Sequence, residues 1–302
     1  MKLLHIKDGH PRNVEFIRRA CILFNIEYHH TYESYPSDNG YDIIWAPMEW
    51  IDPDRYPHSK IIFGPHFWVF PDNNDPLYTR AKPEHAKRCI YLCLSDWNIH
   101  VFNEFLAIQP PIIPHVALPF GVLNSVQGIS TTKSSYDYDC IIYFKARHPT
   151  YLDFCMKIVE ERGLKYRLFR YGTYSRDEYM AALQRTRFVI WIGSHESQGF
   201  GLEECLTSNT PIYLYDAPSM KCEYINGSYS FAHYPQQLRA TSAPYWNNEC
   251  GMKVHTHDEF IQRLPEFIER LPTYNPAAYV ERMLTDRVCF QRFLDVLRVE
   301  HL

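Results

Sequence analysis

The chain has 302 residues, a formal charge of -4 and 46% hydrophobic residues, which is enough apolar material for two modest domains or one large domain. It carries no long basic run, and this argues against nucleic acid as the main partner. Its nine scattered cysteines predict buried free thiols in a reducing compartment, because their odd number gives no disulfide framework. The N-terminal apolar run is too short for a signal peptide and no stretch could span a bilayer, so we expect a soluble, cytoplasmic protein without a transmembrane segment.

The first half of the chain alternates short apolar runs with amphipathic stretches. KLLHI predicts a strand, and PRNVEFIRRACILF predicts a helix because its apolar residues recur near a helical repeat. Three nearly continuous apolar runs follow, bounded by Pro, Gly or Asp, as in parallel strands buried on both faces: YDIIWAP, KIIFGPHF and CIYLCLS. DWNIHVFNEF then predicts a helix, and PHVALPFGV predicts a further strand and turn.

A polar segment rich in Ser and Thr, LNSVQGISTTKSSYDYD, is the best candidate for a linker, and the β/α alternation restarts after it. Its expected strands are CIIYFKA, KYRLFRYG, RFVIWIG and TPIYLYD, with helices between them. Two such runs predict an α/β protein with two doubly wound, Rossmann-like domains facing across a cleft. The expected boundaries are an N-terminal domain at 1–122, a linker at 123–136, a C-terminal domain at 137–274 and a helical tail at 275–302.

The turn HESQGFGLEE, residues 195–204, follows the apolar run RFVIWIG. Ligands of open parallel sheets bind beyond the carboxyl ends of the strands, where glycines allow close approach and a helix beginning near Gly201 offers N–H groups to an anion. A carboxylate one turn further on can accept two hydrogen bonds from a vicinal diol. Acidic residues are also favourable in a first helical turn without any ligand. The turn alone leaves both interpretations open.

The surroundings of this turn carry a family resemblance. Glu196 and Glu204 are separated by seven residues, and Pro211 follows seven residues after Glu204, before another apolar run. This pattern resembles the signature of retaining GT-B glycosyltransferases, particularly family 4: Glu, seven residues, Glu, then a short helix and G-x-P. YRLFRYG and EYMAALQRTRFVIWIGSHES resemble the segments that lead into the motif, and LSDWNIHVFNEF with VALPFGV resembles the end of the family's N-terminal domain. The specific motif is residues 196–211.

The resemblance implies that the C-terminal domain binds a nucleotide sugar and the N-terminal domain an acceptor. Glu204 would bind the ribose hydroxyls of the donor, and Glu196 would contact hydroxyls of the donor sugar. The other donor-binding residues that it implies lie in turns and at the start of the helix: Gly9, Gly172, Gly199, Phe200, Gly201 and Leu202. Gly9 stands alone where the family commonly has two glycines, which leaves its contact with the donor phosphates open.

Three further residues receive catalytic roles from the resemblance. Lys145 and Arg147 in YFKARHP occupy the place of a basic pair that clamps the diphosphate, and two cations with a helix N-terminus can stabilise it as a leaving group without a metal ion. A solvated loop after a strand is the alternative. His66 would approach the donor sugar and the acceptor; the alternative is a packed core histidine.

Two further sequence features need interpretation: a pair of acids that resembles a metal-binding motif, and one departure from the family pattern. Asp137-Tyr138-Asp139 spells D-x-D, which holds a divalent cation in the other glycosyltransferase fold, but paired acids at a strand start are usually solvated. We therefore expect no metal ligands and no cofactor. Asn209 stands where the family has Gly after the short helix, and asparagine is the next best residue for a left-handed C-cap, so this departure should cost little.

The resulting hypothesis is a hexosyltransferase-like glycosyltransferase, in class EC 2.4. It would move a sugar from a nucleotide-diphosphate-sugar donor to a glycan or other hydroxyl acceptor, with retention of anomeric configuration and without metal. Two alternatives remain open: a non-catalytic nucleotide-sugar-binding protein, and a GT-B sugar-nucleotide epimerase.

Overall fold

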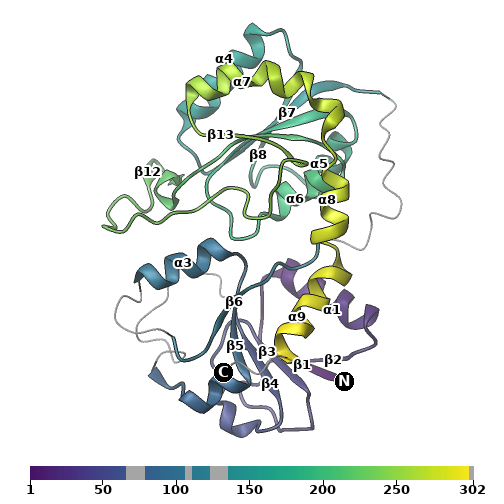
Figure 1. The fold of residues 1–302 in the computed structure, drawn as a ribbon, viewed down its shortest axis with the longest axis vertical. Helices are drawn as coiled ribbons and strands as arrows, with labels where there is room; N and C mark the ends of the chain where they lie inside the picture. Colours follow the sequence, from purple (N-terminus) through teal and green to yellow (C-terminus); the bar gives the residue numbers. More distant parts are fainter. Residues whose placement is uncertain (66–78, 106–110, 123–134, 299–302) are drawn as a thin grey trace. The chain divides into compact units, whose positions relative to one another are not determined.

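A computed structural model describes residues 1–65, 79–105, 111–122 and 135–298. The chain divides into two compact units, one of Met1–Asn124 with Leu284–Leu302 and one of Ser125–Met283. Each unit contains a parallel sheet with helices on its faces (Figure 1). In these ranges no helix combines the length and the apolar character that a membrane span needs. All nine cysteines are free thiols, and all but Cys222 are buried.

The first unit is built on a six-stranded parallel sheet with the order β2-β1-β3-β4-β5-β6. Its strands are β1 (Lys2–Ile6), β2 (Glu27–Thr31), β3 (Ile43–Ala46), β4 (Lys60–Phe63), β5 (Cys89–Cys93) and β6 (His115–Ala117). The inner strands β3, β4 and β5 consist almost wholly of buried residues, because helices or loops cover both faces of a parallel sheet. Their continuous apolar sequences are the signal from which they were predicted.

The helices of the first unit include α9 (Asp286–Arg298), which follows the second unit in sequence. Within the described ranges they also include α1 (Pro11–Leu23) and α3 (Asp96–Phe105), with short 3-10 turns at Pro53–Arg55 and Pro83–Lys87. Helix α9 packs on α1, where the rings of Phe16 and Phe290 lie 6.1 Å apart edge to face. The guanidinium of Arg19 on α1 donates to both carboxylate oxygens of Asp286, which is 1% exposed, at 2.8 and 3.0 Å. The end of the chain is thus part of the first unit.

The second unit is built on a five-stranded parallel sheet with the order β13-β10-β9-β7-β8. Its strands are β7 (Tyr138–Lys145), β8 (Tyr166–Arg170), β9 (Thr186–Gly193), β10 (Ile212–Tyr215) and β13 (Gly251–Val254), and β11 (Tyr224–Ile225) with β12 (Ser228–Tyr229) forms a separate antiparallel hairpin. The helices are α4 (Pro149–Glu161), α5 (Arg176–Leu183), α6 (Phe200–Thr207), α7 (His257–Glu269) and α8 (Pro276–Met283), with 3-10 turns at Met220–Cys222 and Leu271–Thr273.

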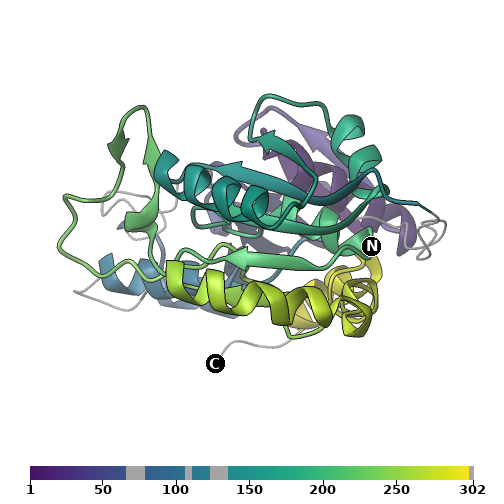
Figure 2. The same ribbon diagram turned by 90° about the horizontal axis from the view of Figure 1, so that it is seen from above.

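Alternate residues of the central strands of this sheet point to two different helix layers. Phe188 and Ile190 of β9 belong to a core cluster with residues of α4 and α7, which lie side by side over that face (Figures 1 and 2). Trp191 points to the other face, where its ring stacks on that of Tyr143 at 3.9 Å. Helices α5 and α6 cover this second face, since Tyr143 contacts the ring of Tyr179 on α5. Burial on both sides explains why RFVIWIG is apolar throughout.

The structure divides the predicted tail, 275–302, between the two units. Helix α8 contacts α6 in the second unit, whereas α9 packs on α1 in the first. Of the predicted linker, 123–136, only residues 135 and 136 lie inside the described ranges. The domain boundaries expected from the sequence therefore stay a prediction at the linker.

Asn209 occupies the left-handed conformation expected after the short helix, with a φ of 49°. Its side-chain oxygen also accepts a hydrogen bond from the backbone N–H of Ala277 at 3.2 Å, at the start of α8. We expect Asn209→Gly to lose only this contact, at about 1 kcal/mol, and Asn209→Ala to lose about 1–2 kcal/mol more, because alanine resists positive φ. Urea unfolding of both variants tests this order. A variant Asn209→Ala as stable as the wild type would contradict it.

Candidate functional site

The second sheet has a topological switch point between β7 and β9. From β7 the chain continues to β8 on one side, and from β9 to β10 on the other. In open parallel sheets, ligands bind outside the carboxyl ends of the strands at this point, because the two loops diverge there. Lys145 ends β7 and pairs in register with Gly193, which ends β9. The loops that follow these two residues form the candidate site.

An ion pair joins the two loops. The ammonium of Lys145 donates to both carboxylate oxygens of Glu196, at 2.7 and 2.8 Å. The side chains are sheltered, with 21% of Lys145 and 11% of Glu196 exposed. The ammonium also lies 4.4 Å from the ring centre of Tyr171, in the turn after β8. Sheltered charges act on a ligand more strongly than surface charges do, because less water screens them. The sequence predicted both residues at the site but not their contact.

Burial and neighbouring charges set the protonation of the groups around this pair. Burial lowers the pKa of Lys145, but the charge and hydrogen bonds of Glu196 outweigh burial and leave the pKa raised. Burial, with the charge of Lys145, lowers the pKa of His195 to about 4, so this imidazole is neutral at pH 7. Burial also raises the pKa of Glu223, whose carboxylate lies 3.8 Å from His195. The site thus holds a permanent cation beside a carboxylate, with a neutral histidine next to them.

Glu223 reaches the site on the segment that leads into the β11–β12 hairpin. The backbone N–H of Tyr224 donates to the carbonyl oxygen of Ala146 at 3.0 Å, and the ring of His148 lies 4.6 Å from that of Tyr224. These contacts fasten the hairpin segment to the loop after β7. Sequence reasoning missed Glu223 and Tyr171, because nothing in their local sequence distinguishes them from ordinary loop residues.

Arg147 lies in the interior of the second unit, 3% exposed. Its guanidinium stacks on the ring of Tyr151 at 4.3 Å and donates to the carbonyl oxygen of Gly193 at 3.0 Å. The sequence predicts that Arg147 and Lys145 form a basic pair that clamps the diphosphate, and this role stays a prediction. In the structure Arg147 makes contacts that hold the end of β9, and of these two residues Lys145 is the one whose cation lies beside Glu196.

The two glycines of the turn differ in what they do. Gly199 precedes α6 with a φ of 92°, a conformation that favours glycine. Gly201 packs against the sheet, since a Cβ there would lie 3.4 Å from Trp191 and 3.5 Å from the hydroxyl of Tyr143. Leu202 is 1% exposed, so only its backbone could face a ligand. Phe200, the first residue of α6, is half-buried. This first turn places the positive end of a helix dipole at the switch point.

The two acids of α6 have different partners. Glu204 is 4% exposed, and the Nε of Arg176, at the start of α5, donates to its carboxylate at 2.6 Å. Glu203 is 1% exposed and accepts a hydrogen bond from the side chain of Gln198 at 3.0 Å. Sequence reasoning missed Arg176, although its place at the start of a helix facing the motif was foreseeable from the order of the elements.

Three predicted site residues remain: His66, Gly9 and Gly172. His66 lies outside the described residues. Gly9 belongs to the first unit, where a Cβ would lie 3.2 Å from Pro47 and from Val14. Gly172 follows β8 with a φ of 80° and has open space around it, so its backbone conformation accounts for the glycine. The roles predicted for these three residues stay predictions.

The D-x-D segment lies at the amino end of β7, away from the switch point. Asp137 pairs with Arg185 at 2.6 Å, and Asp139 pairs with Arg187 at 2.9 Å. Over the described ranges, no group of three or more His, Cys, Asp or Glu residues is placed to hold a metal ion. The expectation of a reaction without metal stays a prediction.

Comparison of the sequence with protein-family models and with curated proteins gives no match. Solved structures do resemble the fold. AviGT4, described as a glycosyltransferase involved in avilamycin A biosynthesis, aligns with a TM-score of 0.55 at 11% identity, over 99% of this chain and 97% of its own. The lipopolysaccharide outer core galactosyltransferase WaaB aligns with a TM-score of 0.53 at 12% identity, over 98% and 99%. Sucrose-phosphate synthase from Thermosynechococcus elongatus aligns with a TM-score of 0.51 at 8% identity, over 99% and 98%.

These likenesses establish the fold. The chain has the architecture of GT-B glycosyltransferases, with two Rossmann-like units that each carry a parallel sheet. The fold class predicted from the sequence is confirmed. Because the identities are so low, activity has to be argued from the site itself.

Proposed function

We propose that the chain is a glycosyltransferase that moves a sugar from a nucleotide-diphosphate-sugar donor to a hydroxyl group of an acceptor. The observation that carries this proposal is the Lys145–Glu196 pair at the switch point, beside the first turn of α6. A cation and a helix N-terminus favour an anion, whereas carboxylates accept hydrogen bonds from sugar hydroxyls. A nucleotide sugar presents both kinds of group. The fold shared with three sugar transferases agrees with this function.

We propose that charged groups of the second unit orient the donor. Lys145 and the first turn of α6 would face the diphosphate, Glu196 the hydroxyls of the transferred sugar, and Glu204 the ribose hydroxyls. We assign Arg147 to holding Gly193 in place, because its guanidinium is buried against that carbonyl group. The spacing of Glu196 and Glu204 supports a relationship to family 4.

In the proposed reaction, the bond between the anomeric carbon and a diphosphate oxygen breaks, and the acceptor oxygen forms a bond to that carbon. The electron pair leaves with the nucleoside diphosphate, and an oxygen of this leaving group takes the proton of the acceptor hydroxyl. Lys145 stabilises the negative charge that develops as the bond breaks. We propose that this cation and the helix dipole suffice without a metal ion, and that the anomeric configuration is retained as in the family that the sequence resembles.

A thermal-shift screen with UDP, GDP, ADP and dTDP sugars, with and without EDTA, tests the donor site. We expect one nucleotide to raise the melting temperature in both conditions, followed by transfer or slow hydrolysis of the matching donor. Loss of the shift in EDTA would contradict the metal-free part of the proposal.

Other outcomes would replace the proposal. Interconversion of the donor sugar without transfer would favour the epimerase, and tight binding without any turnover would favour a binding protein. If no nucleotide shifts the melting temperature at millimolar concentration, the proposal of a donor site is contradicted.

A further inference from the structure

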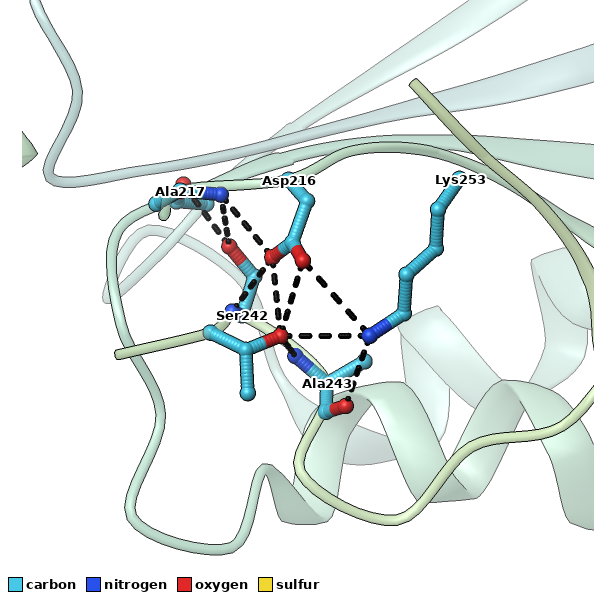
Figure 3. A network of polar contacts seen from close by, with 7 residues as sticks. Asp216, Ala217, Ser242, Ala243 and Lys253 are labelled. Atoms are coloured by element: carbon cyan, nitrogen blue, oxygen red, sulfur yellow. Dashed lines mark hydrogen bonds and ion pairs between the residues drawn. The ribbon is translucent and has the colours of Figure 1, made fainter. Parts of the chain in front are cut away.

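A polar network lies at the carboxyl ends of β10 and β13, beside the candidate site (Figure 3). Asp216 directly follows β10 and is 4% exposed. Its carboxylate accepts hydrogen bonds from the backbone N–H groups of Ala217 and Ser242, at 2.9 and 2.7 Å, and from the hydroxyl of Thr241, at 2.9 and 3.0 Å. One buried carboxylate thus binds both the turn that follows β10 and the segment of Thr241 and Ser242, which is distant in sequence.

Lys253 completes the network from β13. Its ammonium lies 3.5 Å from the carboxylate of Asp216 and donates to the hydroxyl of Thr241 and the carbonyl oxygen of Ala243, at 3.2 and 3.1 Å. It also lies 5.5 Å from the ring centre of Trp246. The cation and the carboxylate therefore bind the same short segment, residues 241–243.

This segment in turn contacts the loop that carries Glu196. The carbonyl oxygen of Thr241 accepts the backbone N–H of Glu196 at 3.0 Å. The hydroxyl of Ser242 donates to the carbonyl oxygen of Gly193 at 3.2 Å, the same oxygen that Arg147 contacts. Continuous hydrogen bonds thus lead from Asp216 and Lys253 to the backbone at the end of β9 and to the backbone of Glu196.

We propose that Asp216 and Lys253 are positioning residues for Glu196. They hold residues 241–243, an irregular segment, so that its Thr241 carbonyl group fixes the backbone of Glu196 in the orientation that meets the donor sugar. This inference rests on the proposed function. Neither residue need touch the substrate. A displacement of about 1 Å in a substrate-contacting group can cost on the order of 100-fold in rate, so such support has a measurable effect.

A purely structural role for the network predicts something different. A network that only stabilised the unit would, when broken, weaken every ligand contact of that unit alike. A positioning role predicts a loss confined to the sugar, because Glu196 meets the sugar, whereas Lys145, α6 and Glu204 meet the nucleotide. Comparing a nucleoside diphosphate with the intact donor therefore separates the two roles.

The test uses Asp216→Asn, with Lys253→Met as a second variant should the first fail to fold. We expect Asp216→Asn to lower kcat by about 10- to 100-fold and to leave the Kd of the nucleoside diphosphate within about threefold. Lys253→Met should act in the same direction with a smaller effect. Hydrogen exchange should show faster exchange of the Glu196 amide in both variants, while amides in the centre of β9 keep their protection.

Asp139→Asn is the matched control. Like Asp216, Asp139 pairs with a cation, that of Arg187 at 2.9 Å, and accepts a backbone N–H, from Lys165 at 2.9 Å, but it lies at the amino end of β7. We expect it to leave kcat and the exchange of the Glu196 amide unchanged. An equal loss of kcat in this control, or equal losses of nucleotide and donor binding in Asp216→Asn, would overturn the inference.

The inference and the proposed function can fail separately. If the wild-type chain turns over no donor, the proposed function is contradicted. The exchange measurement stands without turnover, and an unchanged Glu196 amide in Asp216→Asn would overturn the positioning role even in an active enzyme.

Discussion

Replacing Lys145 with methionine is expected to lower kcat by about 10²- to 10³-fold, because it removes the cation that lies beside Glu196 at the end of β7. The diphosphate gains negative charge as its bond to the sugar breaks, and a fixed ammonium stabilises that charge without reorganisation. Since chemistry suffers more than binding, the KM for the donor should rise less than kcat falls. Steady-state kinetics with the donor found by the thermal-shift screen measures both constants.

A structural cost accompanies this substitution and has to be separated from the catalytic one. Lys145→Met removes the ammonium that pairs with the carboxylate of Glu196, which is 11% exposed, and this lowers stability. The double variant Lys145→Met/Glu196→Gln removes the carboxylate charge as well, so it should regain stability but not activity. Lys157→Met on α4 is the control, because its side chain is 72% exposed and pairs with Glu161 on the same helix. A single variant Lys145→Met with more than a tenth of the wild-type kcat would contradict the role of this cation.

The sheets could be predicted from the sequence where burial acts on both faces. RFVIWIG is apolar at every position because β9 lies in the centre of its sheet between two helix layers. Strand β2, with the sequence EYHHT, gave no such signal, because it lies at an edge and its side chains are half-exposed. Its polar groups find partners from other segments: the hydroxyl of Tyr28 lies 2.8 Å from the ring of His5, and the ring of His30 lies 2.8 Å from the carbonyl oxygen of Lys7.

Helix α7 was missed for a related reason. Pro265 in its interior reads as a helix breaker, since it leaves the carbonyl oxygen four residues earlier without its usual donor. Here the guanidinium of Arg162 donates to that oxygen, on Ile261, at 3.1 Å. A tertiary contact thus compensates for the lost helix hydrogen bond, and the local sequence could not predict this contact.

The candidate site shows the same division between local and distant information. Lys145, Glu196 and Glu204 could be singled out because they match the family pattern that the sequence resembles, in which a basic pair follows the first strand of the second domain and two acids are separated by seven residues. The burial of Arg147 depends on Tyr151 and Gly193, and Asp216 and Lys253 looked like ordinary charges near strand ends. Their partners come from segments far apart in sequence, which only the folded sheet brings together.

Glu204→Gln is expected to weaken binding of the nucleoside diphosphate by about 10- to 100-fold, because hydrogen bonds to a charged acceptor are worth about 1.5–3 kcal/mol. The carboxylate is 4% exposed and already bound by Arg176 at 2.6 Å, so it is held in a fixed orientation. If it accepts hydrogen bonds from the ribose, a donor lacking the 2′-hydroxyl should bind the wild type less tightly. Titration calorimetry with the ribonucleotide and its 2′-deoxy analogue measures this difference.

Measuring the ribonucleotide and its 2′-deoxy analogue in both the wild type and Glu204→Gln isolates the contact between Glu204 and the 2′-hydroxyl. In Glu204→Gln the ribonucleotide and its 2′-deoxy analogue should bind almost alike, because the charged acceptor that distinguishes them is gone. Glu203→Gln is the matched control, since it makes the same change one residue earlier on a carboxylate that accepts from Gln198. That control should keep the preference for ribose. If Glu204→Gln still prefers the ribonucleotide, another group recognises the ribose. The role of Glu204 would then be its ion pair with Arg176.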